Sequence, residues 1–157
     1  MSDDTDYESI SKLTWDSIPE VKLLPTGTWL LKCRGTKYQP PKDADKSAQV
    51  VFIYEPIEPQ DDVDDAAITM LGPKYNYSEN RIFHRMWAKS ASDWDKIGKH
   101  LALHGITDIR ANYADPYDAV KAAKNCDVLG YVIEETFNSK KTGKSEPQNS
   151  IQFFQAP

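Results

Sequence analysis

The sequence predicts a single domain that is mainly β with helices (α+β), in which a helical segment separates the third of five strands from the fourth. A chain of 157 residues is long enough for one domain with a hydrophobic core. Hydrophobic residues make up 39% of it and charged residues 27%, which is typical of a globular protein. Five stretches show the alternation or the β-branched and aromatic enrichment of strands, and one longer stretch has an apolar stripe at helical spacing.

The chain opens with a leader, residues 1–25, which we expect to be acidic and partly flexible. Four of its first eight residues are Asp or Glu, and the turn signal PTG begins at its last residue. Scattered apolar positions, Trp15 among them, indicate that part of the leader packs on the domain. The domain itself is expected to span residues 26–157.

The first strand is expected at TWLLKCRGTKY, residues 28–38. Gly35 is a candidate bend or bulge, so the alternation of faces is not extended beyond it. Before that glycine, alternation predicts one apolar face and one polar face. The apolar face holds Trp29, Leu31 and Cys33, and the polar side holds Lys32, Arg34 and, past the glycine, Thr36.

A polar, proline-rich loop leads to the second strand, AQVVFIYEP at 48–56, which is apolar on both faces and is expected to end at Pro56. Residues 57–80 then form a long, irregular, acidic insertion. The third strand is expected at RIFHRMWAK, residues 81–89. Alternation places Arg81, Phe83, Arg85, Trp87 and Lys89 on one side of it, and Ile82, His84, Met86 and Ala88 on the other.

The helical segment begins with SASDWDKIGKHLALHG, where Ser90 or Ser92 caps the helix and Gly105 ends it. Pro116 is suited to the first position of a second, short helix. Two strands follow, CDVLGYVIEETF and NSIQFF, and a turn-rich connection joins them. That connection contains Lys140, Lys141 and Lys144.

Five strands with a helical segment between the third and the fourth is the element order of the OB fold, a small, partly open barrel. Over roughly residues 15–155 the sequence resembles the bacteriophage single-stranded DNA-binding proteins built on this fold. The resemblance rests on LPTGTWLLKC, VVFIYEP, RIFHRMWAK, WDKIGKHLALHG and KKTGKSEPQNSIQFF. It implies that the first three strands and the connecting loops form a groove for single strands.

The residues themselves fit this chemistry. Binding of single strands without sequence preference needs cations that follow the phosphates and flat rings on which bases stack. The sequence therefore predicts a non-enzymatic protein that coats and protects single-stranded DNA during phage replication or recombination. The predicted contact residues are Lys32, Arg34, Tyr38, Arg81, Phe83, Arg85, Trp87 and Lys89, with Lys140, Lys141 and Lys144 in the last hairpin.

Other interpretations stay open at this stage. Basic and aromatic residues also alternate on ordinary solvated sheets, and a lysine-rich turn also keeps an exposed hairpin soluble. Tyr75 and Tyr77 either fold over bound DNA or anchor the insertion by packing. Two other classes of function also remain: a protein-interaction adaptor, such as an inhibitor that mimics DNA, and a virion assembly protein. The sequence leaves monomer and dimer both open.

The net charge of −5 at first argues against nucleic acid. However, eight of the 24 acidic residues lie in two short runs, at 3–8 and 61–65. The rest of the chain therefore has 16 acidic and 19 basic residues. These acidic runs are solvated loops, docking segments for replication or recombination proteins, or competitors of DNA for the basic groove. No acidic residue follows Glu146, so recruitment through an acidic C-terminal tail is not expected.

No motif for catalysis or for a cofactor is present, so we expect no enzyme and no cofactor. His100 and His104 have a spacing that can hold a metal, but no HExxH pattern surrounds them, so no metal site is expected. The chain has no membrane-length apolar run and no secretory leader, which predicts a cytoplasmic protein, in the host cell if it is phage-encoded. Cys33 and Cys126 are expected to be reduced core residues.

Overall fold

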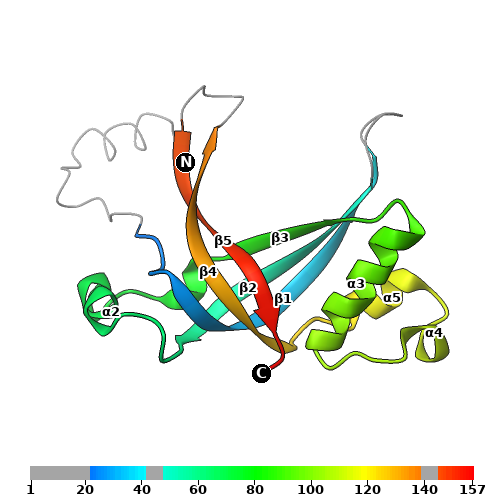
Figure 1. The fold of residues 1–157 in the computed structure, drawn as a ribbon, viewed down its shortest axis with the longest axis horizontal. Helices are drawn as coiled ribbons and strands as arrows, with labels where there is room; N and C mark the ends of the chain where they lie inside the picture. Colours follow the sequence, from blue (N-terminus) through cyan, green and yellow to red (C-terminus); the bar gives the residue numbers. More distant parts are fainter. Residues whose placement is uncertain (1–21, 42–47, 139–144) are drawn as a thin grey trace, which may run out of the picture.

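A computed structural model describes residues 22–41, 48–138 and 145–157. Its centre is one five-stranded antiparallel sheet with the strand order β3-β2-β1-β4-β5 (Figure 1). This confirms a mixed α+β domain with its helical segment between the third and fourth strands. The strands are β1 (Gly27–Gln39), β2 (Gln49–Pro59), β3 (Ile82–Trp87), β4 (Asp127–Asn138) and β5 (Ser145–Gln155).

The sheet is open, because β3 and β5 are its two outer strands and do not pair with each other. Its strong twist nevertheless brings these two strands close together. The ring of Phe154 in β5 lies 4.7 Å from the ring of His84 in β3, measured between centroids. The interior enclosed by the curled sheet is therefore filled by side chains from both edges.

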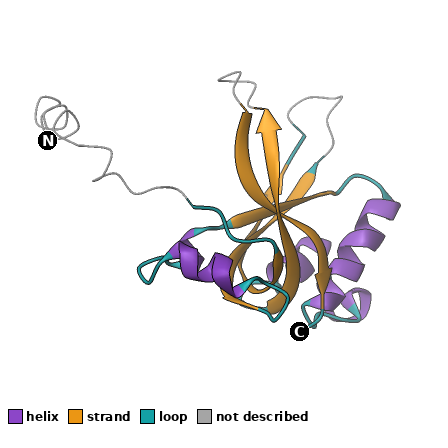
Figure 2. Cartoon of the chain, turned by 60° about the vertical axis from the view of Figure 1, so that its left-hand side comes forward, coloured by secondary structure: helices purple, strands orange, loops and turns teal. Residues whose placement is uncertain are grey.

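The helices lie at two ends of the sheet (Figures 1 and 2). At one end, α3 (Ala91–Leu103), α4 (Ile109–Asn112) and α5 (Pro116–Lys121) pack together, and α2 (Asp65–Leu71) lies at the other end with a 3-10 turn at Tyr77–Glu79. None of the helices in the described residues is long and apolar enough to cross a membrane.

Local sequence signals explain where α3 and α5 begin. The Ser90 hydroxyl accepts a hydrogen bond from the Asp93 backbone N–H, and the Asp93 carboxylate accepts one from the Ser90 N–H, which forms a capping box. Asp115 caps α5, and Pro116 occupies its first position as predicted. Gly105 follows α3 with a φ of 84°, a conformation that suits glycine at the end of a helix.

The core is built from the inner side chains of the strands and the apolar stripe of α3. Trp29, Leu31 and Cys33 of β1 are buried as predicted, and the Trp29 indole N–H donates to the Pro25 carbonyl at 3.0 Å. Cys33 and Cys126 are free thiols, as expected. Further buried side chains that pack with them include Val50, Phe52, Tyr54, Ile82, Ile97 and Leu101.

A bulge at Arg34 decides which way the second half of β1 faces. In the pairing of β1 with β2, Cys33 lies opposite Tyr54 and Gly35 lies opposite Ile53, so Arg34 is the extra residue. The bulge expected near Gly35 is present, and it reverses the alternation that holds in the first half of the strand.

The second strand and the insertion differ from the prediction. β2 does not end at Pro56 but continues to Pro59, because a register shift opposite Leu30 and Leu31 accommodates the proline, which lacks an N–H. The rest of the insertion forms α2 and the 3-10 turn instead of an irregular loop. In its acidic run, Asp62 accepts hydrogen bonds from the Thr28 backbone and hydroxyl, and Asp64 caps α2. At least these two carboxylates therefore have structural roles.

Candidate nucleic-acid interface

The two sides of β3 have the characters that the sequence predicts. Ile82 and Ala88 are buried, and His84 and Met86 are half-buried, on the side toward the core. On the other side Phe83 is 52% exposed and Trp87 56% exposed. Two large rings in solvent on one strand are unusual for a surface that only packs. They lie on the side of the sheet that faces away from the core.

Antiparallel pairing shows which residues of the neighbouring strands share this surface, since residues directly opposite each other point to the same side of a sheet. Phe83 lies opposite Ile53, and Trp87 lies opposite Gln49. In β1, Lys32 lies opposite Glu55, and Arg34 reaches the same glutamate. We call this surface the cationic face, and it carries Lys32, Arg34, Lys37, Glu55, Arg81, Phe83, Arg85 and Trp87.

Several cations of this face are held in place by ion pairs with carboxylates. The Lys32 Nζ lies 3.8 Å from Asp127 Oδ1. The Arg34 Nε lies 2.6 Å from Glu55 Oε2, and an Arg81 nitrogen lies 3.3 Å from Glu55 Oε1. Glu55 therefore joins two arginines that come from the strands on either side of it. The face keeps an excess of positive charge, because its five cations outnumber two carboxylates, that of Glu55 and that of Asp127, which lies opposite Lys32 in β4.

Lys37 is a cation on this face that the sequence did not single out. The bulge places it opposite Val51, which is opposite Arg85 in the next strand. Strict alternation from Trp29 would have turned Lys37 to the core side. This position could have been predicted from Gly35, which is typical of a bulge, together with the unfavourable burial of a lysine on the core side.

Tyr38 is not on the cationic face. It lies opposite Val50, so it points to the core side of the sheet, where its ring is 4.6 Å from that of Tyr117 in α5. A hydrogen bond with Tyr38 raises the pKa of Tyr117 to about 12. The structure thus pairs Tyr38 with the helical segment and separates it from Phe83 and Trp87.

The remaining predicted residues fall into two groups. Lys89 is exposed and follows β3 directly, and its backbone N–H donates to the Asp93 carboxylate at 3.1 Å. Lys140, Lys141 and Lys144 lie outside the described residues. The structure therefore brings together six of the predicted contact residues on the cationic face: Lys32, Arg34, Arg81, Phe83, Arg85 and Trp87.

The tyrosines of the insertion make packing contacts. The ring of Tyr77 meets that of Trp29 edge-on at 5.0 Å. The Tyr75 hydroxyl donates to the Lys22 carbonyl at 2.8 Å and accepts from the Asn80 side-chain amide at 3.1 Å. Of the two interpretations left open for Tyr75 and Tyr77, these contacts favour anchoring of the insertion.

The histidines of α3 face the core and bind a tyrosine. The Tyr54 hydroxyl lies 2.8 Å from His100 Nε2 and 2.7 Å from His104 Nε2. His104 Nδ1 lies 2.8 Å from the His100 carbonyl and must donate to it, so His104 Nε2 accepts from the Tyr54 hydroxyl. The hydroxyl oxygen then accepts from His100 Nε2–H. The Tyr54 hydroxyl therefore engages the Nε2 atoms of both histidines.

Burial keeps these histidines neutral. It lowers the pKa of His84 to about 4 and that of His100 to about 2, with a further contribution from neighbouring histidines. It also lowers the pKa of His104 and raises that of Tyr54. In the described part of the chain, no three His, Cys, Asp or Glu side chains are grouped so that they could hold a metal ion.

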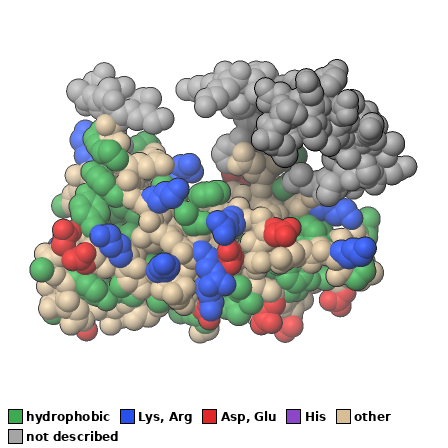
Figure 3. Space-filling model, turned by 180° about the vertical axis from the view of Figure 1, so that it is seen from behind, with side chains coloured by type: hydrophobic (Ala, Val, Ile, Leu, Met, Phe, Trp, Pro, Cys, Tyr) green, Lys and Arg blue, Asp and Glu red, His purple; other side chains and the backbone are tan. Residues whose placement is uncertain are grey.

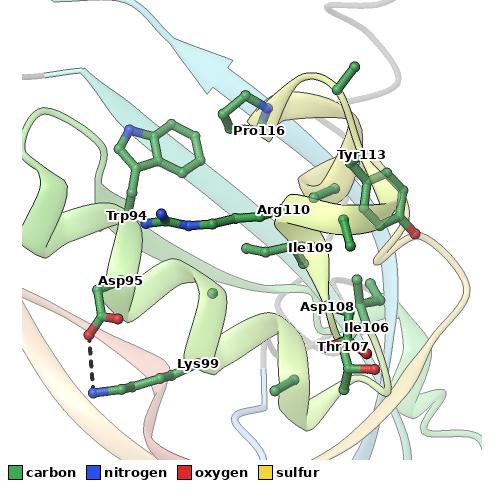
Figure 4. A pocket seen from close by; sticks show the side chains of 15 residues that line it. Trp94, Asp95, Lys99, Ile106, Thr107, Asp108, Ile109, Arg110, Tyr113 and Pro116 are labelled. Atoms are coloured by element: carbon green, nitrogen blue, oxygen red, sulfur yellow. Dashed lines mark ion pairs between the residues drawn. The ribbon is translucent and has the colours of Figure 1, made fainter.

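A cavity of about 840 Å³ lies between α3, α4 and α5. Figure 4 shows the Trp94 ring, the Arg110 side chain and Ile109 at its wall, with Lys99 and Asp95 paired at 3.1 Å nearby. Among the predicted contact residues that the structure describes, none lines this cavity. The cavity is therefore separate from the cationic face.

Lys and Arg side chains gather on one face of the molecule (Figure 3). Figure 3 shows the molecule from behind relative to Figure 1, with Lys and Arg side chains across the middle of the surface and hydrophobic side chains between them. Cations interleaved with exposed rings can hold a polyanion that also carries flat groups. Comparison of the chain with models of known protein families and with curated protein sequences finds no match.

Proposed function

We propose that this protein binds single-stranded DNA, largely without sequence preference, through the cationic face. The observation that carries the proposal is the alternation of exposed Phe83 and Trp87 with Arg81 and Arg85 along one strand. Bases stack on the rings, and the guanidinium groups contact the phosphates between them. Phe83 and Trp87 are four residues apart, or about 13 Å along a strand, so Arg85 lies between two stacking positions.

The fold supports this proposal through its element order. Five strands in the order β3-β2-β1-β4-β5, with helices between β3 and β4, match the arrangement of an OB fold. We propose this fold for the chain, with a sheet that stays open between β3 and β5, where side chains such as His84 and Phe154 meet and no ladder forms. In OB folds, the surface of the second and third strands is a common binding surface for oligonucleotides.

The biological role that follows is a non-catalytic one. The protein coats single strands in the cytoplasm and protects them during replication or recombination, which for a phage protein means the host cytoplasm. Asp62 and Asp64 are engaged within the fold, which favours the acidic N-terminal leader as the segment that docks partner proteins.

The test is a titration of intrinsic tryptophan fluorescence with a poly-thymidine oligonucleotide of about 30 nucleotides, which is longer than the site of one OB fold. A duplex of the same length is the control. Quenching by the single strand that exceeds quenching by the duplex supports the proposal. No binding, confirmed by a gel-shift assay, would refute it and favour a protein-interaction adaptor, whereas stable high-order oligomers without DNA would favour an assembly protein.

A further inference from the structure

Glu55 is a buried carboxylate in the middle of the cationic face. Its side chain is 12% exposed, although it carries a charge and lies on the outer side of the sheet. One oxygen binds the Arg34 Nε at 2.6 Å, and the other lies 3.3 Å from an Arg81 nitrogen. Because a buried carboxylate is unfavourable unless it is paired, we expect both ion pairs to persist in the free protein.

The two guanidinium groups lie further out than the carboxylate they share. The Arg34 side chain is 43% exposed and the Arg81 side chain 59% exposed. A guanidinium has five N–H donors, and the contacts with Glu55 use only the Nε of Arg34 and one terminal nitrogen of Arg81. Each arginine therefore keeps N–H groups in the planar arrangement that binds phosphate oxygens in pairs.

We propose that Glu55 is a positioning residue that holds Arg34 and Arg81 as one binding site for a backbone phosphate, an inference that rests on the proposed function. The site is assembled before the DNA arrives, so the two long side chains do not lose their freedom at the moment of binding. Arg85 and Lys37, which are found in no ion pair among the described residues, act instead as separate charges.

Removal of the Glu55 charge has two opposite effects on affinity, and their sizes decide the outcome. At a separation of about 6 Å near the protein surface and in about 0.5 M salt, which screens most of the interaction, the loss of one negative charge strengthens the attraction of a phosphate about threefold. Release of two arginines that must then be ordered by the ligand weakens binding by about tenfold. The loss of positioning is the larger effect.

The direct test is Glu55→Gln, measured with the same poly-thymidine oligonucleotide in about 0.5 M salt, where screening keeps the charge effect smaller than the positioning effect. We expect affinity to fall about threefold or more. Glu58→Gln is the matched control, because it removes the same charge from an exposed position of the same strand. We expect it to leave affinity unchanged or to raise it slightly. An affinity for E55Q that equals or exceeds that of the wild-type protein would overturn the proposal.

Arg34→Lys tests the same idea without changing the charge or removing Glu55. Lysine cannot supply the Nε–H that binds the Glu55 carboxylate, so we expect R34K to bind about threefold more weakly with the same salt dependence. Unchanged affinity of R34K would contradict the positioning role, even if E55Q failed to fold. The melting temperature of each variant shows that it is folded.

The outcomes separate this inference from the function on which it rests. If the wild-type protein binds single strands and Phe83→Ala weakens binding while E55Q and R34K do not, the positioning role alone is wrong. If the wild-type protein shows no binding, the proposed function fails and the phosphate site fails with it.

Discussion

At the scale of single residues, exposure distinguishes Phe83 and Trp87 from the large rings of the core. Trp29, Phe52 and Tyr54 are buried and hold the core together. Phe83 and Trp87 are each more than half exposed to solvent. Because so much of these rings is already exposed, truncation of either one should change binding far more than it changes stability.

Phe83→Ala is expected to weaken binding of single-stranded DNA by about 1–3 kcal/mol, the contribution of one stacked base. Phe153→Ala is the matched control, since Phe153 is 46% exposed on β5, the edge strand opposite to β3 in the sheet. Both variants should melt within a few degrees of the wild-type protein. Equal affinities of F83A and F153A in the oligonucleotide titration would show that Phe83 does not stack on bases.

His100 gives the protein a predictable dependence of stability on pH. Its pKa is about 2 in the folded protein and 6.5 without burial, so below pH 6.5 the unfolded chain binds more protons than the folded one. The free energy of unfolding should therefore be constant above about pH 7.5 and fall as the pH drops below 6.5, by about 1.4 kcal/mol per pH unit for each such histidine.

Urea unfolding between pH 7.5 and pH 5 measures this fall, in a range where most carboxylates stay ionised. His84→Gln and His100→Gln should each reduce the slope. A free energy of unfolding that does not change between pH 7.5 and pH 5 would show that the histidines are not buried as neutral groups.

At the scale of elements, local patterns predicted most of the fold. The two sides of β3 followed from alternation, and the start of α3 followed from Ser90, one of the two serines suited to cap a helix. In both cases neighbouring residues contain all of the information. The same holds for the buried side of the first half of β1.

The features that could not be predicted depend on partners far away in the sequence. Pro56 remains inside β2 because the register shifts opposite it in β1, and the direction of Tyr38 depends on the bulge at Arg34. Likewise, the insertion is ordered by contacts with Trp29, Lys22 and Asn149 that no local pattern reveals. The sharing of Glu55 by two arginines needs three strands to be placed side by side.

The bulge makes a prediction about Lys37. Because it turns Lys37 to the cationic face, Lys37→Ala should lower the slope of log affinity against log salt by about 0.7, the value for one phosphate contact on a single strand. Lys96→Ala, at an exposed position of α3, should leave the slope unchanged. Equal slopes for K37A and the wild-type protein would place Lys37 away from the DNA.

At the scale of the whole molecule, a protein of net charge −5 is proposed to bind a polyanion. This is physically consistent because charge on a surface acts over about 8–10 Å at physiological salt, so the local excess of cations matters more than the sum. The exposed rings of Phe83 and Trp87 and the arginines of the cationic face lie together on the side of the sheet that faces away from the core.

The measurement that tests the central claim most directly is the fluorescence titration of the wild-type protein with poly-thymidine at low and high salt. With three to five phosphate contacts, we predict preferential binding of the single strand over the duplex, and an affinity whose logarithm falls with log salt at a slope of about −2 to −3.5. Equal binding of single strand and duplex, or no binding at either salt concentration, would contradict the account.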